Sequence, residues 1–184
     1  MGHLDNFAGV HAVMNAYFSG RMASDSLRIE LTYGEETDME GAYEVQATLS
    51  PEDVVVVVDV TGTETERDIT IEKCQSPRMR QFVSAALEGL SYELYENCPD
   101  PIADEDESDV YREKLENVFF LGIPCAGGDY NSGVVSCREA SVRTASEALV
   151  RLAERFVREM NARPSAAGGA GKQLRGICNY RGGQ

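Results

Sequence analysis

The sequence has 184 residues, a formal net charge of −14 and 42% hydrophobic residues, which fits one domain large enough to bury a core. The excess of carboxylates excludes a nucleic-acid-binding protein, because displacing the counterions of a phosphate backbone takes clustered Lys and Arg. Such acidity instead suits a soluble protein, or one whose carboxylates hold cations.

The cysteines and the hydropathy pattern bear on the compartment. Five cysteines at irregular spacing, with no CxxC pair, predict neither a disulfide framework nor a thiolate zinc site. No apolar run approaches the ~20 residues needed to span a bilayer, and the N-terminus lacks the basic and then apolar pattern of a signal peptide. We therefore expect a cytoplasmic protein in a reducing compartment, without membrane attachment.

The first segments of the chain alternate between helical and extended patterns. Apolar residues spaced by three and four predict a helix over 7–18, which the chain enters through Asp5 and Asn6. The alternating segment 27–33 predicts a strand, and 37–49 predicts a short helix.

The segment 54–60 carries the strongest strand signal. Its five consecutive valines present β-branched side chains to both faces, which is typical of a central strand covered by helices on each side. A sheet covered on both faces predicts an α/β layered domain.

The alternation continues along the chain. The segment 67–74 predicts a strand, and 76–90 predicts a helix with Ser76 as its cap and Pro77 in its first turn. The segment 91–96 predicts a further strand.

The remaining segments predict the end of the domain. An acidic loop over 99–109 and a short helix precede an apolar strand over 117–124, which we expect Pro124 to stop. A long amphipathic helix over 137–162 closes the predicted domain. The segment 163–184 is rich in Gly and Ala, with basic residues and no acidic ones, and predicts a flexible tail.

Four carboxylates fall near the ends of these elements: Asp5, Glu35, Glu36 and Asp59. Ligands of α/β sheets gather at the carboxyl ends of strands, and carboxylates that converge there need protons or a divalent metal to relieve their repulsion. Adjacent residues at a bend point in different directions, so one glutamate can ligate a metal while its neighbour acts as general base. The alternative is that Glu35 and Glu36 form a solvated turn. Asp59 follows five valines and is poorly placed unless it faces a site.

The motifs occur in a distinctive order. The segments "LDNFAGVHAVMNAYF", "IELTYGEETDMEGAYEVQ" and "DVVVVVDVTGT" are followed by "DESDVYREKLENVFFLGIPCAGGDYNSGVVSCREAS". Over residues 4–160 this order resembles the di-metal (zinc) aminopeptidase superfamily, in particular its tetrahedral and glutamyl aminopeptidase-like branch. The resemblance implies a three-layer α-β-α sandwich with a mixed central sheet, zinc-exopeptidase-like, over 1–162. The upstream portion of that family has no counterpart in these residues.

The resemblance also implies a role for each carboxylate. Asp5 would bridge two metal ions, and Glu35 would be the general base that deprotonates the bridging water. Glu36 would be a terminal ligand of one metal, and Asp59 of the other. The implied reaction is hydrolysis of the N-terminal peptide bond of a peptide substrate, with zinc as the expected metal and Co, Mn or Mg as alternatives.

The chain departs from the family at the histidines. The family supplies one histidine to each metal, the first upstream of the bridging Asp and the second from a Tyr-His-Ser turn. In this sequence the turn reads Tyr130-Asn131-Ser132. Asn131 is a weaker ligand candidate, because its carbonyl oxygen replaces imidazole poorly on zinc.

Three further side chains are weaker candidates or alternatives. His3 lies two residues before Asp5 and would reach the same side of an extended chain. His11 falls within the first helix and is read as a packing or surface residue. Asp109 aligns loosely with a family Asp near the active site, and a solvated role in the acidic loop is the alternative.

Two functional hypotheses follow. The first is a metal-dependent aminopeptidase-like hydrolase that cleaves N-terminal peptide bonds through a metal-activated water. The alternative is a catalytically inactive, truncated relative that acts as a binding or assembly domain. An unrelated α/β protein with solvated acidic loops is a more distant third reading. In either of the first two cases an exposed sheet edge would favour a homo-oligomer.

Overall fold

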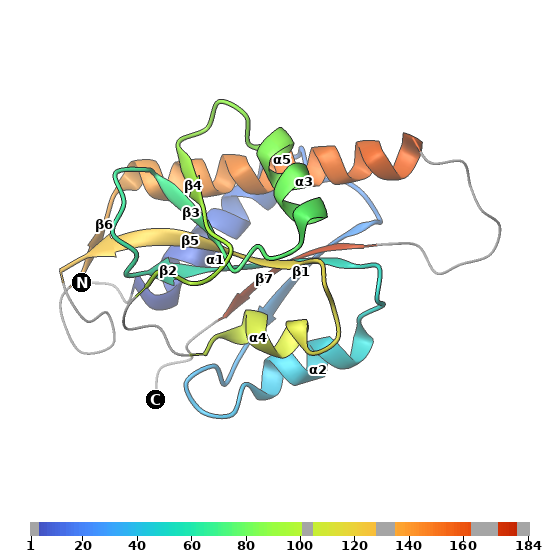
Figure 1. Ribbon diagram of the computed structural model, residues 1–184, viewed down its shortest axis with the longest axis horizontal. Coiled ribbons are helices and arrows are strands. Elements are labelled where there is room, and N and C mark those ends of the chain that lie inside the picture. Colours follow the sequence, from blue (N-terminus) through green and yellow to red (C-terminus); the bar gives the residue numbers. More distant parts are fainter. Residues whose placement is uncertain (1–3, 101–104, 128–134, 163–172, 180–184) are drawn as a thin grey trace.

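The computed structural model describes residues 4–100, 105–127, 135–162 and 173–179, which fold around one central sheet (Figure 1). Both halves of the chain contribute strands to it. The elements are α1 (Leu4–Phe18), β1 (Leu27–Thr32), α2 (Glu40–Thr48), β2 (Val54–Thr61), β3 (Ile69–Glu72), α3 (Pro77–Ala86), β4 (Tyr92–Leu94), α4 (Glu107–Arg112), β5 (Val118–Ala126), β6 (Ser136–Cys137), α5 (Glu139–Ala162) and β7 (Leu174–Asn179).

The sheet is mixed. Its seven strands run in the order β1-β7-β2-β5-β3-β4, and β6 pairs with β5. The strands β1, β7, β2 and β5 are parallel, whereas β3 is antiparallel to β5 and β4 is parallel to β3. The carboxyl ends of four parallel strands therefore lie at one edge of the sheet, which is where α/β proteins place their sites.

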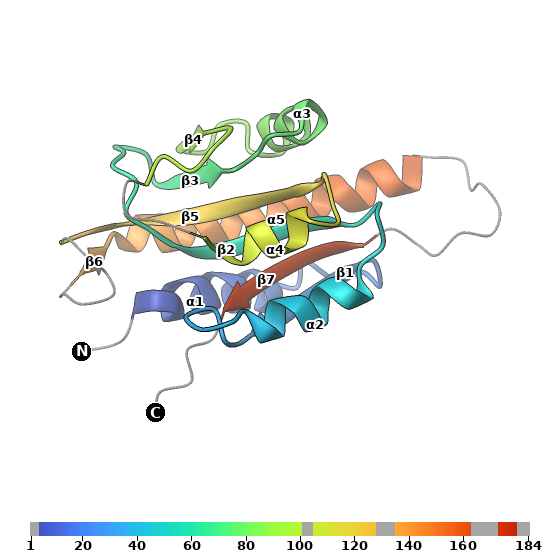
Figure 2. The same ribbon diagram turned by 60° about the horizontal axis from the view of Figure 1, so that its bottom comes forward.

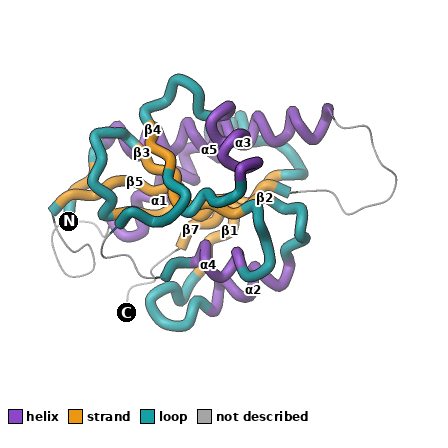
Figure 3. The backbone as a smooth tube through the Cα atoms, viewed as in Figure 1, coloured by secondary structure: helices purple, strands orange, loops and turns teal. Residues whose placement is uncertain are grey.

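Helices cover both faces of this sheet, as the tube and the turned ribbon show (Figures 2 and 3). The helices α1, α3 and α5 pack with the larger apolar cluster on one face, and α2 and α4 pack with the smaller cluster on the other. The α/β layered arrangement and the mixed sheet predicted from the sequence are thus confirmed.

The strand β2 explains why both faces need covering. Val54, Val56 and Val58 belong to the larger cluster, whereas Val55 and Val57 belong to the smaller one. Successive side chains of a strand point to opposite faces, so a run of valines fits only a strand buried on both sides. The prediction of a central buried strand is confirmed.

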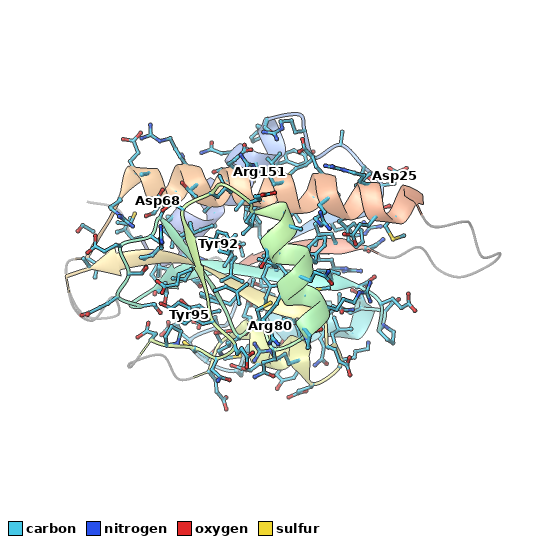
Figure 4. All side chains as sticks on the ribbon, turned by 45° about the horizontal axis from the view of Figure 1, so that its top comes forward. Asp25, Asp68, Arg80, Tyr92, Tyr95 and Arg151 are labelled. Carbon is cyan, nitrogen blue, oxygen red and sulfur yellow. The ribbon has the colours of Figure 1, made fainter. Side chains whose placement is uncertain are left out.

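Two arginines, Arg80 and Arg151, connect the α3 region to its surroundings, and both are labelled in Figure 4. Arg80 donates to the carbonyl of Gln75 over 2.7 Å and pairs with Glu96 at 2.9 Å. Arg151 of α5 donates to the carbonyl of Glu88, just past the end of α3, over 2.9 Å. These contacts connect α3 to α5 and to the segment after β4.

The prediction of a flexible tail is wrong for residues 174–179. They form β7, which inserts between β1 and β2 and buries Leu174, Ile177 and Cys178. The Gly and Ala content of the residues before it masked the signal of a short strand that is buried at Leu174, Arg175, Ile177 and Cys178. The rest of the predicted tail, 163–172 and 180–184, lies outside the described residues. The sheet therefore extends beyond residue 162, the predicted end of the domain.

Pro124 does not stop its strand, contrary to prediction. β5 continues through Ala126. Its pairing with β3 ends at Gly122, before the proline, whereas its pairing with β2 on the other side continues to Pro124 itself. A missing N–H is tolerated where the ladder does not require it. The short helix α4 also begins earlier than predicted, so that it takes the last residues of the acidic loop.

Ser76 is the N-cap residue of α3, as predicted, but its side chain makes no capping hydrogen bond. In the part of the chain that the structure describes, no helix is both long enough and apolar enough to cross a membrane.

Candidate functional site at the carboxyl ends of the strands

The start of α1 is held against β2 by a single amide side chain. Asn6 donates from Nδ2 to the carbonyl of Val58 over 2.7 Å and to Sγ of Cys178 over 3.2 Å, and its Oδ1 accepts from the backbone N–H of Gly9 over 2.9 Å. A Cβ at Gly9 would lie 2.8 Å from the Val58 carbonyl oxygen. Glycine is therefore required for this close approach, and the approach carries Asp5 to the carboxyl end of β2.

Asp59 is the electrostatic centre of the site. It lies two residues before the end of β2, half-buried, and its Oδ1 accepts from the N–H of Val60 over 2.6 Å. The pKa of Asp59 is raised well above its usual range, first by desolvation and then by the charge of Asp5, with smaller contributions from Glu35 and Glu107. Carboxylates from three other segments thus lie close enough to oppose the ionisation of Asp59.

The paired glutamates lie in the turn between β1 and α2. The turn is tight because α2 begins against the chain that leaves β1: a Cβ at Gly41 would lie 2.6 Å from the backbone nitrogen of Tyr33. Glu35 is half-buried and contributes to the raised pKa of Asp59. Glu36 lies beside it with an exposed side chain. The structure therefore brings Glu35 towards Asp59, and for Glu36 it establishes only the neighbouring position.

Glu107 is a site residue that the sequence analysis missed. It is 1% exposed, and neither of its carboxylate oxygens has a hydrogen-bond partner among the described residues. Burial raises its pKa from 4.5 to about 7. A hydrogen bond from the Thr32 hydroxyl would lower this pKa in part, but that hydroxyl donates instead to the Cys178 carbonyl, over 3.4 Å. The signal was helical spacing: Glu107 lies three and four residues before the buried Val110 and Tyr111.

Asp109 serves the cap of α4 rather than the carboxylate group. It completes a capping box with Asp106, and both carboxylates pair with the ammonium group of Lys73, at 2.5 Å and 2.8 Å respectively. Lys73 has a left-handed backbone with φ of 54° and is 6% exposed. These contacts give Asp109 a structural role in joining α4 to the end of β3.

The histidine and asparagine candidates add little to the described site. His3 and Asn131 lie outside the described residues. His11 is exposed on α1, which agrees with the surface reading. Within the described ranges, no group of three or more His, Cys, Asp or Glu side chains is arranged to hold a metal ion.

A buried polar network surrounds the carboxylate of Glu72, at the end of β3. Glu72 is 1% exposed, and its Oε1 accepts hydrogen bonds from the hydroxyls of Thr61, Thr63 and Thr70 at 3.0, 2.9 and 2.6 Å. The thiol of Cys98 donates to Oε2 over 3.3 Å. Four donors satisfy this carboxylate, which explains how it tolerates burial.

An open cavity of about 1070 Å³ adjoins the carboxylates without containing them. Its walls come from the segments that follow β2 and β5, including Gly62 and Gly127, and from the acidic residues Glu64 and Glu93. Cys125 connects the two regions: it lines the cavity, and the charges of Asp59 and Asp5 contribute to the raised pKa of its thiol.

The structure thus brings together Asp5, Glu35 and Asp59 and adds Glu107, with a cavity beside them. The pKa of Asp59 is raised by desolvation and by the charges of its neighbours, and the pKa of Glu107 is raised by burial; raised pKa values of this kind commonly distinguish functional carboxylates from surface ones. No protein-family model matches the sequence, and a search of curated proteins finds no significant match.

Proposed function

We propose that the protein is a metal-dependent aminopeptidase-like hydrolase that cleaves N-terminal peptide bonds through a metal-activated water. The observation that carries the proposal is the raised pKa of Asp59, to which Asp5 and Glu35 contribute although each comes from a different segment of the chain. Repulsion between buried carboxylates costs stability unless a proton or a cation relieves it. A divalent cation would relieve it at neutral pH.

The chemistry of the donors suits a cation of the hard type, although the described side chains are not already arranged around one. The described donors are carboxylate oxygens, which suit Mg and Mn and also occur at zinc sites, although zinc prefers nitrogen and sulfur. The side chains of Asp5 and Asp59 would hold the ion, and Glu36 would complete its ligands after a change of rotamer. The exposure of Glu36 leaves its side chain room for that change.

The chain's own groups would divide the work of hydrolysis. A bound divalent metal supplies Lewis acidity and lowers the pKa of water. Glu35, half-buried near Asp59, would accept the proton of the attacking water. Asn6 would keep Asp5 in place through its bond to the Val58 carbonyl. The adjoining cavity would receive the peptide, and its acidic Glu64 and Glu93 would attract the positively charged amino terminus.

The alternative function is a binding or assembly domain, and the outer edge of the sheet favours it. β1 is an edge strand, and Leu31 is 51% exposed on it. Leu31 lines a second cavity, of about 950 Å³, together with Tyr17 of α1, which is 54% exposed. An edge strand with exposed apolar side chains is a site where another chain can add.

Metal analysis and turnover would decide between these functions. The purified protein is analysed for bound metal and assayed with aminoacyl-p-nitroanilides, with and without added Zn, Mn, Co or Mg. For an active enzyme we expect Glu35→Gln to abolish turnover while metal stays bound, and Asp59→Asn or Glu36→Gln to reduce metal content. Glu139→Gln, on the exposed start of α5, is the matched control and should change neither. Metal-free protein without turnover under any supplement would refute the enzyme and leave the binding domain.

A further inference from the structure

Two cysteines oppose each other across neighbouring strands at the wall of the larger cavity. β6 lies beside the end of β5 (Figure 2) and runs antiparallel to it. Cys125 is the register partner of Cys137. Opposed residues of an antiparallel ladder place their side chains on the same face, with Cα atoms about 4.5–5.5 Å apart. A disulfide accepts Cα separations of about 4.4–6.8 Å. The backbone therefore already has the spacing that a bond between these two sulfurs requires.

The two thiols are also reachable from solvent. Both are half-buried, and both line the cavity of about 1070 Å³. Of the other three cysteines, Cys74 and Cys178 are buried, and the half-buried Cys98 does not line this cavity and donates to the Glu72 carboxylate. Cys125 and Cys137 are the one pair of cysteines that the described strands place in register.

We propose that Cys125 and Cys137 are a modification site at which a reversible intramolecular disulfide forms, with a low-molecular-weight disulfide such as oxidised glutathione as the oxidant. The thiolate of one cysteine attacks the glutathione disulfide, which gives a mixed disulfide and releases one glutathione thiolate. The second cysteine then attacks the protein sulfur of the mixed disulfide and releases the second glutathione. Two protein thiols lose two electrons and two protons, and one glutathione disulfide becomes two thiols.

The raised pKa values of the two thiols determine how fast the disulfide is expected to form. The pKa of the Cys125 thiol is raised to about 12, first by burial and then by the charges of Cys137, Asp59 and Asp5. Burial also raises the pKa of Cys137. The reduced pair is therefore protonated at neutral pH and exchanges slowly, and its rate of oxidation rises with pH. Once a mixed disulfide forms, the opposed thiol is close enough to resolve it.

The bond would join β6 to β5 and close a loop of 13 residues, from 125 to 137. It would fix one wall of the cavity and consume the Cys125 thiol, whose pKa the charge of Asp59 raises. Formation of this disulfide requires only the register and the exposure of the two cysteines, so it does not depend on the proposed hydrolase activity.

Peptide mapping of the oxidised full-length chain tests the site. The reduced protein has five thiols; after incubation with oxidised glutathione we expect three, and five again after dithiothreitol. Trypsin leaves both cysteines in one peptide, 115–138, because no Lys or Arg lies between Lys114 and Arg138. That peptide should lose two hydrogens in mass. Additional cleavage before Asp129 should give two fragments that stay linked until reduction.

Single variants distinguish pairing from simple adduct formation. Cys125→Ser should leave Cys137 as a glutathione adduct, and Cys137→Ser should leave the adduct on Cys125, whereas Cys98→Ser should leave the Cys125–Cys137 bond intact. Five remaining thiols in the wild type, stable adducts on both cysteines, or a bond from either one to Cys98 would overturn the proposal. The wild-type map alone suffices if a variant fails to fold.

Discussion

Asn6 of α1 donates to the backbone carbonyl of Val58 over 2.7 Å, one residue before Asp59. This bond connects the start of the first helix to the central strand. It therefore sets the position of Asp5 relative to Asp59. After desolvation, the charge of Asp5 is the largest contribution to the raised pKa of Asp59. The helix α1 can approach β2 so closely only because residue 9 is a glycine, where a Cβ would lie 2.8 Å from the Val58 carbonyl oxygen.

Substituting that glycine should disrupt the contact. In Gly9→Ala the new Cβ would lie 2.2 Å from Oδ1 of Asn6 and 2.8 Å from the Val58 carbonyl oxygen, and the latter is backbone that cannot move freely. We expect a loss of about 2 kcal/mol or more in the free energy of unfolding, measured by urea denaturation. Gly176→Ala is the matched control, because a Cβ there meets nothing within 4 Å. Equal effects of the two changes would contradict the described packing of α1.

The buried Glu72 should be among the most sensitive carboxylates for stability. Glu72→Ala removes the acceptor shared by the hydroxyls of Thr61, Thr63 and Thr70 and leaves a cavity in the sheet. Unsatisfied buried donors and the lost volume together predict a destabilisation of about 3 kcal/mol or more. Glu88→Ala, at an exposed position, should change stability by about 0.5 kcal/mol or less. A Glu72 variant as stable as the Glu88 variant would show that the network is not formed.

The regular elements could be predicted from the sequence because their burial follows a simple period. The valines of β2 and the apolar spacing of α1 are local signals that survive in the fold. β7 was missed because its few buried residues, Leu174, Ile177 and Cys178, follow a Gly- and Ala-rich segment. Its insertion between β1 and β2 depends on a contact more than a hundred residues away in sequence.

The site was predictable to a similar degree. Asp5, Glu35 and Asp59 stand next to recognisable element ends, and the structure brings their charges together. Glu107 is marked only by its helical spacing before Val110 and Tyr111, and Glu72 has no local mark, since a glutamate in an acidic loop or at the end of a short strand is normally solvated. Only the packing of α4 and the threonines around β3 reveals that these two are buried.

The stability of the metal-free protein should fall as the pH rises through the titration of Glu107. Its pKa is raised from 4.5 to about 7 by burial, so between these pH values the folded state holds a proton that the unfolded state has lost. The stabilisation is complete below pH 4.5 and is lost above pH 7, and it amounts to about 3 kcal/mol. Glu107→Gln should flatten this part of the profile and be more stable than wild type at neutral pH.

Chemical denaturation across this pH range, in the presence of a chelator, is the measurement. The raised pKa of Asp59 acts in the same direction and depends in part on the charge of Glu107, so the difference between wild type and Glu107→Gln reports the titration of Glu107 together with its coupling to Asp59. A difference that does not change with pH would mean that the carboxyl group of Glu107 is solvated in the folded protein.

Asp109→Asn separates the capping role of this residue from metal ligation. Asp109 completes the capping box of α4 with Asp106 and pairs with Lys73 at 2.5 Å, while its side chain remains 37% exposed. Loss of the charge should therefore lower stability by about 1 kcal/mol, measured by urea denaturation. Metal content should be the same as in wild type, in contrast to Asp59→Asn. Loss of metal without loss of stability would instead place Asp109 among the metal ligands.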